Sequence, residues 1–163
     1  MKRAGLSASR NLTHGERALV PESFARELPL SSVRIVLRAH NPFARRKVLV
    51  RGRRIFWPSV PADVSREGAN LQTLLVHELA HVWQYETGRL TAFRYLTNPR
   101  NWRYGYRTGA EFEGLGVEAQ ADLVADWWRV RRSLPPLRHI GAPPTREWLE
   151  EAIPFGRPRY LPV

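Results

Sequence analysis

The stretch LVHELAHVWQ, residues 75–84, constrains this chain more than any other part of its sequence. It lies in a segment where apolar residues recur at helical spacing, namely Leu71, Leu74, Leu75, Leu79 and Val82. Asn70 is a good N-cap residue, and Gly88 suits the C-terminal end of a helix. The sequence therefore predicts an amphipathic helix from Ala69 to about Gly88, with its histidines opposite the apolar stripe.

Two histidines and a glutamate on that helix form the pattern HExxH. His77 and His81 lie four residues apart, so a helix places both rings within reach of a single ion. In this arrangement the imidazoles bind zinc, and the glutamate, here Glu78, accepts a proton from the water that zinc acidifies. The alternative is a pair of histidines on a solvated face. The spacing favours a zinc site with Glu78 as the catalytic residue.

A zinc site needs a third protein ligand, and a second predicted helix offers one. This helix, from about Val117 to Arg132, carries Glu118, Asp122 and Asp126 at four-residue steps among apolar residues. Such an acidic stripe needs a partner. We interpret Glu118 as the third metal ligand and Asp122 as a carboxylate behind the ligands, which accepts a hydrogen bond from the N–H of a ligand histidine that faces away from the metal.

Two alternatives to this assignment remain open from the sequence. Asp122 and Asp126 can instead pair with arginines at the surface. Glu111 or Glu113, which precede the second helix, can replace Glu118 as the third ligand.

The remaining periodicity predicts strands and a division of the chain. VRIVLR (33–38) alternates at period two, and KVLVRGRRIFW (47–57) reads as two strands that turn near Gly52. Together with the helices, these strands predict an α+β fold.

Three regions follow along the chain. We expect a flexible basic arm at 1–12, a folded domain at 13–134 that opens with a capping box of Thr13 and Glu16, and a proline-rich tail at 135–163. The tail is expected to wrap the domain, with one short helical piece.

The composition limits the classes of function. Twenty-six Lys and Arg against 15 Asp and Glu give a net charge of +11, and almost all of the positive charge is Arg. An Arg-rich surface is suited to a polyanion, either nucleic acid or an anionic envelope surface, although a plain solvated surface explains it equally. With no cysteine, thiol catalysis and Cys-ligated zinc are excluded. The N-terminus has no apolar region typical of a Sec signal peptide, and no apolar run suits a membrane span. We expect synthesis in the cytoplasm, with any export through a specialised secretion system.

HELAHVWQ followed by VEAQAD resembles the gluzincin clan of zinc metallopeptidases. In that clan HExxH on one helix is completed by a Glu in an ExxxD pattern on a later helix. His77, Glu78, His81, Glu118 and Asp122 match the pattern position by position. The resemblance implies Zn²⁺ as the cofactor and hydrolysis of peptide bonds as the reaction.

A wider set of motifs is similar to a bacterial family related to VgrG and associated with type VI secretion. LTHGERALV, VRIVLR, HELAHVWQ and VEAQADLVADW carry this similarity over roughly Leu12 to Arg132. The resemblance implies a minimal zincin-like fold, in which a small antiparallel sheet packs on the HExxH helix and the Glu-bearing helix. An extended peptide substrate adds to an edge strand of such a sheet. The candidate edge here is RRIFW, with Arg54, Ile55 and Phe56 as substrate-binding residues.

The clan usually has a Tyr or His that stabilises the oxyanion, placed after the Glu helix. Here only His139 and Tyr160 follow Asp126, and Tyr104 and Tyr106 precede that helix. The oxyanion stabiliser is therefore unassigned.

The expected function is a zinc peptidase acting on a peptide or protein, linked to a secretion system as an effector or accessory enzyme. Two alternatives stand beside it. One is a non-catalytic adaptor that docks on a VgrG-type spike protein or an anionic partner. The other is a DNA-associated metallopeptidase whose arginines hold nucleic acid.

Overall fold

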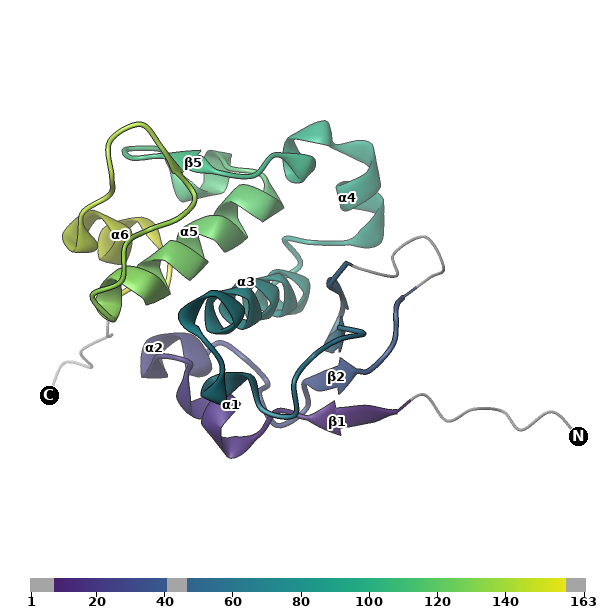
Figure 1. Ribbon diagram of the computed structural model, residues 1–163. Coiled ribbons are helices and arrows are strands. Elements are labelled where there is room, and N and C mark those ends of the chain that lie inside the picture. The colour runs from purple at the N-terminus through teal and green to yellow at the C-terminus, as the bar shows by residue number, and fades with distance from the viewer. Residues whose placement is uncertain (1–7, 41–46, 158–163) are drawn as a thin grey trace, which may run out of the picture.

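The computed structural model describes residues 8–40 and 47–157, which form the α+β fold that the sequence predicts (Figure 1). The elements are β1 (Ser9–Asn11), α1 (His14–Ala18), α2 (Glu22–Ala25), β2 (Arg34–Val36), β3 (Leu49–Arg51), β4 (Arg54–Phe56), the 3₁₀ turn η2 (Val64–Arg66), α3 (Ala69–Glu86), α4 (Ala92–Thr97), η3 (Pro99–Trp102), β5 (Tyr106–Arg107), η4 (Phe112–Gly114), α5 (Val117–Arg131), β6 (His139–Ile140) and α6 (Arg146–Ala152). In Figure 1, α3 runs through the centre, with α5 on one side and the sheet on another. Within the described ranges, no helix combines the length and apolar character that a bilayer span requires.

The main sheet has the strand order β1-β2-β4-β3 and is mixed. The pairs β1–β2 and β3–β4 are antiparallel, whereas β2 and β4 are parallel, with Ile35 opposite Ile55. The hairpin predicted around Gly52 is confirmed, and this glycine has φ +59°. The prediction of a wholly antiparallel sheet is wrong, because the second strand of the hairpin, which carries the fully buried Ile55, takes the central place beside β2.

This strand order also corrects the predicted substrate-binding edge. Arg54, Ile55 and Phe56 form β4, which lies between β2 and β3. The main chain of β4 pairs on both sides, and Ile55 and Phe56 are buried, so these residues offer no free edge to a peptide. On the α3 side of the sheet, the outer strand of the described structure is β3, which packs against α3.

The N-terminal segment is not a loose arm over its described part. Residues 9–11 form β1 and pair with β2, and Leu12 is buried in the core. Residues 1–7 lie outside the described ranges. The capping box is confirmed, because Thr13 Oγ1 accepts from the Glu16 main-chain N–H while the Glu16 carboxylate accepts from the Thr13 N–H.

The proline-rich segment after residue 134 contributes to the core instead of only wrapping it. Its predicted helical piece is α6, which packs against α5 (Figure 1). Phe155 is 4% exposed and stacks on Phe24 at a centroid distance of 4.3 Å, with Trp127 at 5.8 Å in an edge-on arrangement. The predicted boundary at 134/135 is therefore not a boundary of the core. Residues 158–163 lie outside the described ranges.

The predicted long helix is α3, which starts at Ala69 as expected, but Asn70 is not its N-cap. Its N-cap is Gly68, and Gly88 follows the last turn with φ +70°. The helix is not amphipathic in the predicted sense, because all but one of residues 73–84 are buried, the histidines included. Burial on nearly all sides follows from its central position between α5 and the sheet.

Candidate metal centre

Two turns of helix bring three potential ligand atoms together. His77 and His81 stack one turn apart on α3, and Glu118 lies in the first turn of α5, which packs across α3. The Nε2 atoms of the two histidines are 3.2 Å apart, and Glu118 Oε2 lies 3.2 Å from the first and 3.1 Å from the second. They form the one group of metal-ligating side chains that converges in this way within the described residues.

The start of α5 is placed by a close contact with η3. Gly116 is its N-cap, and a Cβ on this residue would lie 2.1 Å from the main-chain oxygen of Arg100. Asn101, which is buried, accepts from the Val117 N–H and donates to the Arg94 main-chain oxygen. Glycine is therefore needed for the approach that brings Glu118 to α3.

The three ligand atoms fit a zinc ion in spacing and in chemistry. With Zn–N and Zn–O bonds of about 2.0–2.1 Å in a tetrahedral arrangement, ligand atoms are expected to lie about 3.3 Å apart. The observed separations of 3.1–3.2 Å agree with this value. Two imidazoles and one carboxylate also match the ligands of catalytic zinc sites, which leave a fourth position open.

His77 is oriented by Asp122, four residues after Glu118 on α5. Asp122 Oδ1 lies 3.2 Å from His77 Nδ1, and Oδ2 accepts from the Gly105 N–H at 2.8 Å. A carboxylate on Nδ1 directs Nε2 toward the ligand position. Burial opposes a charge on His77, but the hydrogen bonds to Asp122 and Glu118 outweigh it and raise the pKa of His77 to about 10.

Glu118, the acidic member of the cluster, is held in its charged form by the two histidines. Burial raises the pKa of Glu118, but the hydrogen bonds to His77 and His81 outweigh it and hold the pKa well below its usual value. Glu118 is thus a carboxylate at neutral pH, as a metal ligand must be.

Glu78 lies beside the three ligand atoms without joining them. It is 5% exposed, and among the described residues its carboxylate has no hydrogen-bond donor. Burial raises the pKa of Glu78, and the neighbouring histidines oppose this rise. A buried carboxylate with a raised pKa and no fixed partner is suited to accepting and returning a proton.

Two tyrosines at the centre lie outside the spacing pattern that identified the ligands. Tyr95 on α4 donates from its hydroxyl to Glu118 Oε1 at 3.1 Å, and burial together with the Glu118 charge raises the pKa of Tyr95 to about 12. The ring of Tyr104 lies face-to-face with that of His77 at a centroid distance of 6.4 Å. Tyr104 belongs to a run of interleaved Arg, Trp and Tyr at residues 98–107 that stands out in the sequence, but nothing local in the sequence signals Tyr95.

The alternative ligands are placed elsewhere. Glu111 is exposed, and Glu113 forms an ion pair with Arg89 at 2.7 Å. Asp126 is buried and accepts from the Tyr106 hydroxyl and from the main-chain N–H groups of residues 137 and 138. Asp126 therefore fixes the segment after α5, instead of pairing with a surface arginine. Asp122, besides its contact with His77, does pair with the exposed Arg138 at 3.7 Å, as the alternative predicted for this residue.

Comparison with known proteins finds similarity to a protein of bacterial type VI secretion. It is 26% identical over 132 residues to the type VI secretion system spike protein VgrG2b of Pseudomonas aeruginosa. The match covers 74% of this chain but 13% of the spike protein, so the chain corresponds to a small part of that relative. No family model matches the chain.

A comparison with solved structures finds similarity to the same protein. The effector domain of Pseudomonas aeruginosa VgrG2b superposes with a TM-score of 0.64 at 25% identity, over 77% of this chain and 76% of that one. By sequence and by fold, this chain is thus similar to the effector domain of a VgrG spike protein.

Proposed function

We propose that this protein is a zinc-dependent peptidase that acts as a type VI secretion effector. The observation that carries the proposal is the convergence of His77, His81 and Glu118, with Glu78 beside them. A zinc ion held by these ligands supplies Lewis-acid polarisation of a carbonyl and acidifies water at neutral pH.

The protein groups then perform the proton transfers. Glu78 accepts the proton of the attacking water and returns it to the leaving amine, which its raised pKa favours. Asp122 holds His77 in orientation, and Tyr95 holds the second oxygen of Glu118 away from the other ligand atoms. In this proposal Asp122 and Tyr95 only orient the ligands, and Glu78 is the single residue that transfers a proton.

The substrate proposed is an extended peptide, from a protein or from a peptidoglycan stem. β3 is the outer strand beside α3, and a peptide that pairs with it would run along the helix that carries Glu78. This replaces the predicted edge at residues 54–56.

The decisive experiment compares the wild type with Glu78→Gln and His81→Ala. Zinc content is measured by elemental analysis, and hydrolysis is measured on a panel of unfolded proteins and peptidoglycan peptides. We expect about one zinc per chain and turnover in the wild type, zinc without turnover in Glu78→Gln, and neither in His81→Ala.

Cell-level activity gives a second test. Production of the wild type in the cytoplasm or the periplasm of a bacterial host should impair growth in one compartment, and Glu78→Gln should not. Zinc binding with no hydrolysis, or toxicity that is undiminished in Glu78→Gln, would instead support a non-catalytic adaptor.

A further inference from the structure

The side-chain amides of two buried glutamines form a hydrogen-bonded series that ends at His81, one of the proposed zinc ligands. Gln84 is fully buried on α3, one turn after His81, and Gln120 is 5% exposed on α5. His81 Nδ1 lies 2.8 Å from Gln84 Oε1, and Gln84 Nε2 lies 3.0 Å from Gln120 Oε1. Neither glutamine contacts the ligand position itself.

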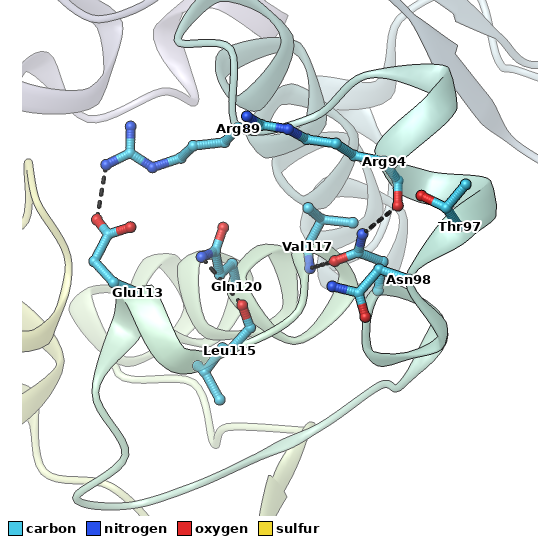
Figure 2. Close-up of a pocket in the computed structure, with 9 residues that line it drawn as sticks. Arg89, Arg94, Thr97, Asn98, Glu113, Leu115, Val117 and Gln120 are labelled. Carbon is cyan, nitrogen blue, oxygen red and sulfur yellow. Dashed lines mark hydrogen bonds and ion pairs between the residues drawn. The ribbon is translucent and has the colours of Figure 1, made fainter.

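The orientation of the outer amide is fixed by main-chain carbonyls. Gln120 Nε2 donates to the oxygens of Phe112 and Leu115, at 3.0 and 3.4 Å. A carbonyl only accepts, so the NH₂ group of Gln120 must face them and its oxygen must face Gln84. Figure 2 shows Gln120 and Leu115 among the residues that line a pocket, so Gln120, the outer of the two amides, lies at the pocket wall. The volume of this pocket is about 430 Å³.

The orientation of the inner amide follows by the same reasoning. Gln84 Nε2 donates to the main-chain oxygen of Val117 at 2.9 Å as well as to Gln120 Oε1. Both partners are acceptors, so the Gln84 oxygen must face His81. An amide oxygen can only accept, and His81 Nδ1 must therefore carry the proton of this hydrogen bond.

We propose that Gln84, held by Gln120, is a positioning residue that fixes the tautomer of His81 and presents its Nε2 lone pair to the zinc ion. This inference rests on the proposed zinc site. Neutral histidine in water favours the opposite tautomer, with the proton on Nε2, which would point an N–H at the metal. The amide chain removes that competing state before the metal binds, in the role that Asp122 has for His77.

The test compares zinc affinity and thermal stability in a matched set of variants. Gln84→Met keeps the length of the side chain and removes the acceptor. Gln84→Glu keeps an acceptor for His81 but sets a second oxygen against the acceptors of Val117 and Gln120, so it lowers stability without freeing the ring. Gln72→Met is the control, because Gln72 lies on the same helix and bonds only to main-chain oxygens near η2.

Zinc affinity is measured by competition with a chromophoric chelator. We expect Gln84→Met to bind zinc about 10–100-fold more weakly than the wild type, as loss of a partner that orients a ligand does. Gln84→Glu should stay closer to the wild type than to Gln84→Met despite its lower Tm, and Gln72→Met should not change. Affinity that instead falls in step with Tm across all variants would show a packing role and overturn the inference.

A second measurement needs no substitution. Nitrogen-15 NMR of the zinc-loaded wild type should place zinc on Nε2 of His81 and a slowly exchanging proton on Nδ1. Zinc on Nδ1 would refute the assignment. The two proposals fail separately: a wild type that binds no zinc overturns both, whereas equal affinity in wild type and Gln84→Met overturns only the role of Gln84.

Discussion

Replacement of Glu16 by glutamine should remove a large part of the stability of this domain. The carboxylate of Glu16 is fully buried and accepts four hydrogen bonds, two on each oxygen. Two come from Arg10 at 2.7 Å, and the others come from the main-chain N–H groups of Thr13 and Val64 at 2.9 Å. These bonds join β1, α1 and η2. Whichever way a glutamine turns, its NH₂ group faces two donors.

The magnitude follows from those lost bonds. Two hydrogen bonds to a charged group contribute about 1.5–3 kcal/mol each, and loss of one partner from a buried ion pair costs about 3–5 kcal/mol. Because the side chain of Arg10 is 22% exposed and regains some water, we expect the lower end, about 3 kcal/mol, or a fall in Tm of about 6–12 °C. Urea denaturation measures it. The control is Glu22→Gln, whose carboxylate is 82% exposed in an ion pair on α2 and should change stability by less than about 0.5 kcal/mol.

The same carboxylate predicts a dependence on pH. Burial raises the pKa of Glu16, but the hydrogen bonds from Arg10 and the two main-chain N–H groups outweigh it, and the pKa falls below its usual 4.5. A pKa that is lower in the folded state contributes stability that is complete above the unfolded value and is lost as the pH falls through the folded value. The difference between wild type and Glu16→Gln should therefore be constant near neutral pH and shrink below about pH 4.5. An equal difference at about pH 3, or a midpoint shift no larger than that of Glu22→Gln, would refute this reasoning.

Three further predictions concern the metal and the core. Asp122→Asn should weaken zinc binding by about 10–100-fold, because one amide cannot accept from both His77 and the Gly105 N–H; unchanged affinity in a chelator competition would contradict the assigned contact. Zinc at about 1,000 times its Kd should stabilise the folded protein by about 4 kcal/mol in calorimetry, and His81→Ala should abolish the effect. Phe155→Ala should lower the free energy of unfolding by about 3–5 kcal/mol in chemical denaturation, since its ring is stacked in the core. A decrease of less than about 1 kcal/mol would show that the segment after residue 134 does not contribute to the core.

The sequence by itself determined the local part of the candidate site. His77 and His81 share a face because a helix repeats every 3.6 residues, and Glu118 and Asp122 share one for the same reason. The capping box at Thr13 and the turn at Gly52 are likewise local, since each involves residues within a few positions of one another. Such features depend on the backbone geometry of a single element, so the spacing of residues along the sequence is enough to predict them.

The tertiary structure alone decided what joins distant parts of the chain. Strand order placed β4 inside the sheet and β3 at its edge, a choice that the alternating pattern of both strands permits equally. The contact of Tyr95 with Glu118, the meeting of Gln84 with Gln120, and the packing of Phe155 on Phe24 join residues 23 to 131 positions apart. These contacts result from the packing of whole elements against one another. Burial on both sides of α3 places the face that carries the histidines in the interior, where it forms a wall of the candidate metal centre.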